Sequence, residues 1–231
     1  QLVQVLENSV LTSIQCLHTS GVYLQESQYH LWKISTHCLQ CLRKKMYVDT
    51  INPVEFKIVG EDLKDFLQGL ITNNINNIDK EPVETFILTP QGKIKHQVKI
   101  TDKGDGFSIL CTNDQSNLFA FLNLYGKFKG IVVEKVDVKE VYDKKYFLGL
   151  LEQGKLDTNF LTQPALYPAE VDDSLVDYKK GCYLGQEVVS RMKHRQKNKK
   201  QIKILNILNT KPSDAKVLLE IENYIIIKVP V

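Results

Sequence analysis

The chain has 231 residues, 43% of them hydrophobic and 25% charged, and its formal net charge is +3. These values are ordinary for a globular protein of one large or two small domains, and so weak a charge does not by itself imply a nucleic-acid partner. The apolar runs are short and interrupted, which argues against a transmembrane helix, and five unevenly spaced cysteines argue for a reducing compartment, so we expect a cytoplasmic protein.

Residues 1–46 differ in composition from the rest of the chain. They carry few charges, and the first methionine of the chain is Met46. They contain three cysteines, three histidines and the only tryptophan: Cys16, Cys38, Cys41, His18, His30, His37 and Trp32. We therefore expect an N-terminal extension that is an upstream translation outside the native fold, with Met46 as the true start.

Two other interpretations of this extension stay open. His37, Cys38 and Cys41 offer a C-x-x-C pair to zinc, but a structural zinc site needs four ligands and no second pair follows at the usual spacing. A targeting segment is the other, but its Arg-rich pattern is missing because Arg43 is the only arginine in the extension. We expect no metal site in the chain.

Residues 47–140 predict a first subdomain. Residues 54–59 alternate between apolar and polar, as in a strand, whereas the apolar residues of 63–71 recur at helical spacing. The same patterns predict strands at 83–89, 94–100, 107–111 and 131–138 and a helix at 118–125. The order β-α-β-β-β-α-β favours an α+β unit in which two helices cover one face of a mainly antiparallel sheet, close to a ferredoxin-like split βαβ unit with an added strand.

Two further blocks follow. Residues 141–198 form a second subdomain, which begins with the apolar run 146–151. Residues 199–231 hold three strand-like runs, at 202–208, 217–221 and 224–229. We expect these runs to form a short β module, part of a barrel; truncation of that barrel at the end of the sequence stays open. No internal repeat or low-complexity linker separates the blocks.

The stretch Lys180-Gly181-Cys182-Tyr183-Leu184-Gly185-Gln186-Glu187, with Arg191 four residues on, is the most informative in the chain. The two glycines can bracket a tight turn that presents Cys182, and the pattern becomes helical from Gly185. Glu187 and Arg191 can pair at i, i+4 on one helix face. A helix N-terminus and nearby cations favour a thiolate, so Cys182 is a candidate reactive thiol; the alternative is a cysteine buried at a strand-to-helix corner.

The pattern K-G-C-Y-x-G-Q-E-x-x-x-R resembles the signature of the YgfZ-type folate-binding proteins. These proteins are relatives of the glycine-cleavage aminomethyltransferase, or T-protein, and serve iron–sulfur cluster assembly or repair. Three more segments resemble the family, so that the resemblance spans about residues 47–200: 66–74 (FLQGLITNN), 88–93 (LTPQGK) and 168–170 (PAE). The resemblance implies a cloverleaf fold, with two ferredoxin-like units and a β-barrel around a central folate pocket.

The resemblance also implies a set of site residues. Cys182 is the expected functional centre, and tetrahydrofolate is the expected cofactor. The expected folate-binding residues are Asn74, Glu170, Lys180, Tyr183, Gln186, Glu187 and Arg191. Three of these have plainer interpretations: Glu170 as a surface residue of an acidic loop, Lys180 as a solvated cation and Tyr183 as a core aromatic residue.

Asn74 is the main departure from the family pattern. The resemblance places an aspartate here in the aminomethyltransferases, where its carboxylate is tied to the reaction at folate nitrogen. An amide can hydrogen-bond but cannot shuttle a proton, so we do not expect a classical aminomethyltransferase. The expected function is a tetrahydrofolate-binding accessory factor for iron–sulfur cluster assembly, repair or delivery; the alternative is a folate-dependent one-carbon transferase.

The expected partners are folate and iron–sulfur client or carrier proteins, with no membrane. Clusters are usually held by four cysteines, so Cys182 could hold a transient cluster only together with a partner. A second alternative is an RNA-interacting protein related to tRNA modification, acting through the basic run Lys193–Lys200. That run lacks interleaved aromatic residues, and a solvated face is the favoured interpretation.

Overall fold

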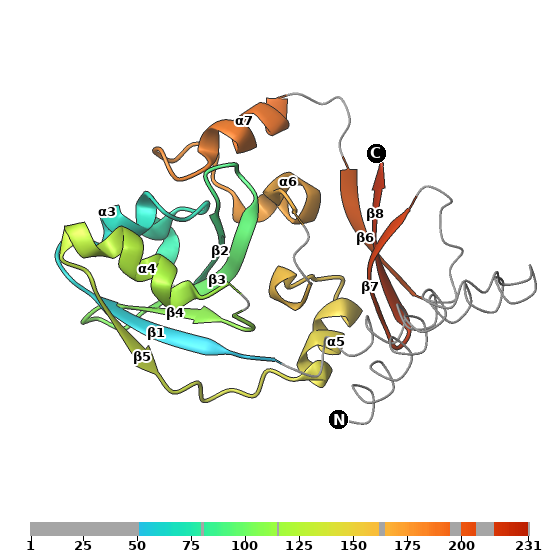
Figure 1. The fold of residues 1–231 in the computed structure, drawn as a ribbon, viewed down its shortest axis with the longest axis horizontal. Helices are drawn as coiled ribbons and strands as arrows, with labels where there is room; N and C mark the ends of the chain where they lie inside the picture. Colours follow the sequence, from blue (N-terminus) through green and yellow to red (C-terminus); the bar gives the residue numbers. More distant parts are fainter. Residues whose placement is uncertain are drawn as a thin grey trace, which may run out of the picture. The chain divides into compact units, whose positions relative to one another are not determined.

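The computed structural model describes residues 51–79, 81–114, 116–161, 165–194, 200–206 and 215–230 (Figure 1). The chain divides into two units, Gln1–Arg43 and Lys44–Val231, and all of the described residues belong to the second. The predictions for residues 1–46, including the zinc and targeting alternatives, therefore lie outside the described residues.

The first sheet has five strands, in the order β2-β3-β4-β1-β5, and every neighbouring pair is antiparallel. Its strands are β1 (Val54–Val59), β2 (Val83–Leu88), β3 (Ile94–Asp102), β4 (Phe107–Cys111) and β5 (Val132–Val136). The helices α3 (Leu63–Gln68) and α4 (Leu118–Gly126) lie against one face of this sheet (Figure 1). Alternation in β1 buries Val54, Phe56 and Ile58 against these helices, as the period of two predicts.

The predicted order β-α-β-β-β-α-β is confirmed, but the ferredoxin-like pattern holds for only one crossover. Strands β4 and β5 run parallel with β1 between them, so β4-α4-β5 is a split βαβ unit. The β3–β4 hairpin inserts two strands between β1 and β2, which therefore run antiparallel. The connection β1-α3-β2 is thus not a split βαβ unit, because the added strand reverses the direction of β2.

Helix α3 is shorter than its apolar pattern predicts. It ends at Gln68, and the backbone N–H of Gly69 bonds back to the Asp65 and Leu67 carbonyls. Leu70 and Ile71 still pack in the core, but Ile71 does so from a β-bridge with Ile87. The helical spacing of these two residues therefore indicates that their side chains are buried, not that their backbone is helical. The short helix η2 (Ile75–Asp79) follows.

Short helices make up most of the second block. After η3 (Lys127–Lys129) and β5 come α5 (Lys144–Glu152), η4 (Thr158–Phe160), α6 (Pro168–Val171), η5 (Asp173–Leu175) and α7 (Gln186–His194). The Asp143 carboxylate caps α5 by accepting from the N–H of Tyr146. Among the described residues, none of the helices combines the length and apolar character needed to cross a membrane.

The C-terminal strands are β6 (Lys200–Asn206), β7 (Lys216–Ile221) and β8 (Tyr224–Pro230). They form an antiparallel sheet in the order β6-β8-β7, so the three predicted strands are confirmed. Within the described ranges this sheet stays open, with two free edges and no closed barrel. A second core joins it to the helices: Phe147, stacked on Phe160 with ring centroids 4.4 Å apart, shares a cluster with Ile226 of β8.

We expect the segment Met46–Val231 to fold without residues 1–45. The boundary between the two units falls at Arg43/Lys44, close to the break in composition, so the deletion removes only Lys44 and Lys45 from the second unit. The thermal midpoints of the full and the shortened chain, followed by circular dichroism, should agree within a few degrees. Loss of a cooperative transition in the shortened chain would show that the N-terminal residues belong to this fold.

Candidate functional site

Cys182 is an exposed residue in the irregular segment just before α7, as the motif predicts. Cys111, the other cysteine in the described part of the chain, lies in β4 and is completely buried. Burial is the main reason that the pKa of the Cys111 thiol is raised. The alternative of a buried Cys182 at a strand-to-helix corner is therefore wrong, and of the two described cysteines Cys182 is the one that a partner can reach.

Gly185 locks the segment that carries Cys182 onto the β2–β3 hairpin. Its φ is +81°, and a Cβ atom on it would lie 2.6 Å from the Thr89 carbonyl oxygen and 3.0 Å from the Gly92 Cα. Gly92 has a φ of +73°, and a Cβ there would lie 2.8 Å from the Val188 Cβ. The two backbones approach closely only because both residues are glycine. Gly181 needs no such freedom, because its φ is not positive and a Cβ would meet nothing within 4 Å.

Lys180 ties the same segment to the loop after α3. Its ammonium donates to the carbonyl oxygens of Ile71 (2.7 Å) and Asn73 (2.9 Å), and it lies 5.1 Å from the centre of the Tyr183 ring. Only 8% of Lys180 is exposed, and desolvation lowers its pKa to about 8 in spite of the opposing charge of Asp177. The interpretation of Lys180 as a solvated cation is therefore wrong; its ammonium is directed into the protein.

Asn74 lies beside this anchor in a setting that suits an amide. Its Nδ2 donates to Asp177 Oδ2 (3.1 Å), and its Oδ1 accepts from Gln68 Nε2 (3.1 Å). The backbone N–H of Lys179, with help from Asn74, lowers the pKa of Asp177. A carboxylate at position 74 would face the Asp177 carboxylate without a proton to share, so the neighbour of position 74 favours an amide there.

Tyr183 is a core residue and so is not free to stack on a ligand. It is 7% exposed and packs in a cluster with Phe86, Leu88, Val176 and Val189, which joins β2 to α7. Burial raises the pKa of Tyr183 to about 12. The plainer interpretation of this residue, a core aromatic, is the one that the structure supports.

Glu170 is buried as well, at 7% exposure, which contradicts its interpretation as a surface residue of an acidic loop. Its carboxylate accepts from Lys228 Nζ (2.7 Å) of β8 and from the backbone N–H of Tyr167 (3.1 Å). The second bond closes the N-terminus of α6, which begins at Pro168. Glu170 therefore fastens α6 to the C-terminal sheet.

Helix α7 carries the rest of the predicted set on its outer side. Gln186 is its first residue, and its backbone N–H donates to the Tyr183 carbonyl. Glu187 and Arg191 form the predicted i, i+4 ion pair, with both side chains more than half exposed. Lys193 pairs with Asp173 and lies over the Tyr178 ring. Residues 195–199 of the basic run lie outside the described residues.

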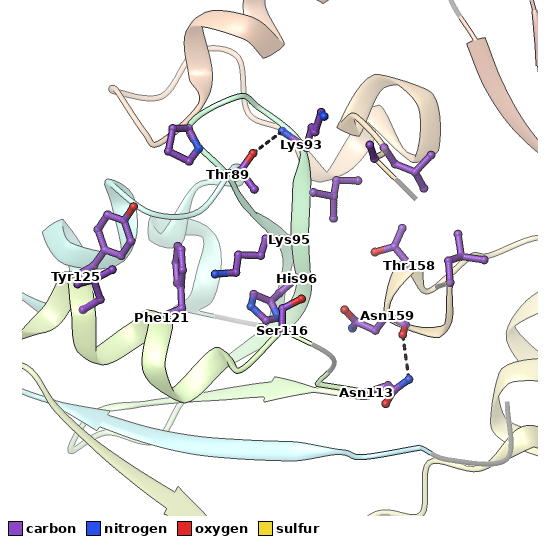
Figure 2. Close-up of a pocket in the computed structure, with 16 residues that line it drawn as sticks. Thr89, Lys93, Lys95, His96, Asn113, Ser116, Phe121, Tyr125, Thr158 and Asn159 are labelled. Atoms are coloured by element: carbon purple, nitrogen blue, oxygen red, sulfur yellow. Dashed lines mark hydrogen bonds between the residues drawn. The ribbon is translucent and has the colours of Figure 1, made fainter. Parts of the chain in front are cut away.

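A cavity of about 440 Å³ is lined in part by Thr89, Pro90 and Lys93 of the β2–β3 hairpin, the element that Gly185 contacts (Figure 2). Its walls are mostly apolar, with two aromatic rings, two lysines and several amide and hydroxyl groups, and none of the lining residues is acidic. The lining residues are Thr89, Pro90, Lys93, Ile94, Lys95, His96, Asn113, Ser116, Phe121, Leu124, Tyr125, Thr158, Asn159, Leu161, Ala165 and Leu166. None of the predicted folate-binding residues is among them.

A hydrogen-bonded amide network holds one wall of the cavity. Asn159 donates to the Gln97 carbonyl (2.7 Å), and Asn113 donates to the Asn159 carbonyl (3.1 Å). Behind them, Asp157 accepts from Thr112, and burial raises the pKa of Asp157 to about 6. The network joins β3, the segment just after β4, and η4, so the polar groups of this wall are held in place before any ligand binds.

His96 is the least expected residue of the cavity. It is 1% exposed, its Nδ1 lies 3.8 Å from Asp114 Oδ1, and its Nε2 has no hydrogen-bond partner in the described structure. Desolvation lowers its pKa to about 4, so the ring is neutral near pH 7. In the sequence it is one of five histidines with no motif around it, and only the LTPQGK segment nearby could have drawn attention to it.

The predicted residues thus fall into three groups, one of which is Gln186, Glu187 and Arg191 on α7. Asn74, Lys180 and Tyr183 surround and support the Cys182 segment, whereas Glu170 belongs to the junction of α6 with β8. No group of three or more His, Cys, Asp or Glu side chains suited to a metal ion occurs in the part of the chain that the structure describes. No protein-family model matches the chain, and no curated protein matches it significantly.

Proposed function

We propose that the chain is a tetrahydrofolate-binding accessory factor for iron–sulfur cluster assembly, repair or delivery, with Cys182 as its functional centre. One observation carries the proposal. The exposed Cys182 sits in a segment whose Gly185 packs against the same hairpin, Thr89 to Lys93, that forms a wall of the 440 Å³ cavity. The segment that carries the accessible thiol and the cavity therefore both adjoin the same hairpin.

The chemistry of the cavity suits a folate. A folate combines a flat heteroaromatic ring system, rich in hydrogen-bonding groups, with an acidic tail. Phe121 and Tyr125, with centroids 4.7 Å apart, offer aromatic surface, the amides of Asn113 and Asn159 offer polar contacts, and Lys93 and Lys95 supply positive charge. A mostly apolar cavity with a few fixed polar groups is the usual form of a small-molecule site. We therefore propose the folate site at these residues rather than at Lys180 and Tyr183.

The proposed role of Cys182 is to supply one thiolate ligand or nucleophile to a shared cluster. One cysteine cannot hold an iron–sulfur cluster alone, so the remaining ligands come from a client or carrier protein. A shared cluster requires a thiol that the other protein can reach, and Cys182 is exposed at the surface. In this proposal the chain is a cytoplasmic, aminomethyltransferase-like protein that has lost aminomethyl transfer, since Asn74 is matched to Asp177 as an amide.

We expect tetrahydrofolate to bind the unmodified chain and Lys95→Ala to weaken binding by roughly tenfold or more, the loss of about 1.5–3 kcal/mol that a charged hydrogen bond contributes. Lys95 lies in the cavity, 4.2 Å from the centre of the Phe121 ring. Lys99→Ala is the matched control, because Lys99 lies on the same strand, is exposed and does not line the cavity. Isothermal titration calorimetry of the three proteins decides: equal losses from both variants would remove the folate from this cavity.

A further inference from the structure

Buried polar atoms without a hydrogen-bond partner destabilise a fold and are therefore rare. His96 Nε2 is such an atom. The other buried side-chain nitrogen and oxygen atoms of the described residues, except the Tyr183 hydroxyl, have hydrogen-bond partners. Tyr183 does not line the cavity, whereas His96 does, beside Lys95 and Ser116 (Figure 2). Replacing an unpartnered buried nitrogen by an apolar group costs the fold nothing, so a role in the cavity is a better account of His96 than a role in packing.

The neighbours of His96 decide which form of the ring the cavity meets. A neutral imidazole carries one N–H donor and one acceptor nitrogen. Nδ1 faces the Asp114 carboxylate at 3.8 Å, and that carboxylate is already fixed by the backbone N–H groups of Ser116 and Leu118. A proton on Nδ1 lowers the energy next to this charge, which leaves Nε2 as the acceptor. The other charged neighbour, Lys95, disfavours a second proton on the ring.

We propose that Nε2 of neutral His96 accepts a hydrogen bond from an N–H or O–H group of the ligand and so positions a heteroaromatic ring against Phe121. The inference rests on the proposed function for the identity of the ligand and adds its orientation: the donor edge of the ring lies at His96, and the acidic end lies toward Lys93. His96 is then a specificity-determining residue, because a ring with only acceptors at this edge leaves Nε2 unpaired.

Two substitutions test the acceptor. His96→Leu removes it at similar volume and should weaken tetrahydrofolate binding by roughly tenfold, the loss expected for one hydrogen bond, while the thermal midpoint stays equal or rises. His96→Gln can place its Oε1 near the position of Nε2 and should keep the affinity within about threefold of the unmodified chain. A purely structural histidine would show the opposite: a lower midpoint in both variants and no difference in affinity between them once folded.

A spectroscopic measurement on the full chain keeps the test independent of folding. In ¹⁵N-labelled protein, the imidazole signals that disappear in His96→Gln report the tautomer directly. We expect a protonated Nδ1 and an unprotonated Nε2 in the free protein, with the Nε2 signal moving upfield when tetrahydrofolate is added. A proton on Nε2 in the free protein, or an Nε2 signal that ignores bound tetrahydrofolate, as water alone in the cavity would give, overturns the assignment of His96. No binding by the unmodified chain overturns the proposed function, and this inference with it.

Discussion

Replacing Gly185 by alanine should lower the free energy of unfolding by about 2–5 kcal/mol. The left-handed conformation at φ +81° costs an L-residue roughly 1–2 kcal/mol, and forced overpacking adds about 1–3 kcal/mol. The clash cannot be relieved by a side chain, because the atoms that the new Cβ meets are the Thr89 carbonyl oxygen at 2.6 Å and the backbone of Gly92. In a chain of this size the loss corresponds to a fall on the order of 10 °C in the thermal midpoint.

Gly181→Ala is the matched control, four residues earlier in the same motif. Its Cβ would meet nothing within 4 Å and its φ is not positive, so its midpoint should stay within about 2 °C of the unmodified chain, as for most surface substitutions. The comparison separates the effect of the close contact between Gly185 and the hairpin from a general effect of alanine substitution in this motif. If the two alanines were equally harmless, the close approach of Gly185 to Gly92 would not hold the Cys182 segment in place.

Strand β1 of the first sheet could be predicted because only one of its two faces is buried. One-sided burial imposes a period of two on residues such as Val54, Phe56 and Ile58, and this period is visible in the sequence without knowledge of any partner strand. The end of α3 could not be predicted in the same way. Leu70 and Ile71 keep the helical spacing although they lie beyond the helix, because the core needs apolar side chains there whatever the backbone does.

The candidate site could be predicted only where a local motif carries it. The exposure of Cys182 and the Glu187–Arg191 pair follow from residues close together in the sequence. The cavity does not, because it brings together residues from Thr89 to Leu166 that come from β3, α4 and η4. Burial of Lys180 was likewise hidden, since its carbonyl partners, Ile71 and Asn73, lie more than a hundred positions away.

Cys182→Ser should abolish the cellular function and leave the fold intact. Cys182 is exposed, so exchange of its sulfur for oxygen removes no buried contact, and the thermal midpoint should not change measurably. In cells that lack the native protein, the serine variant should fail to restore the activity of iron–sulfur enzymes, because a hydroxyl is a far weaker ligand and nucleophile than a thiolate. The unmodified chain, expressed at the same level, sets the reference activity.

Cys111→Ser should behave in the opposite way and so acts as the control. It places a hydroxyl in a fully buried site of β4, which should lower the thermal midpoint, yet the variant should still restore the iron–sulfur enzymes as long as it folds at the growth temperature. Labelling with a thiol probe, followed residue by residue by mass spectrometry, should modify Cys182 faster than Cys111 by a factor on the order of a thousand, because Cys111 reacts only when β4 opens. Full restoration of enzyme activity by Cys182→Ser would show that this thiol has no role in the proposed function. Because Cys182 is exposed, packing would not account for it either.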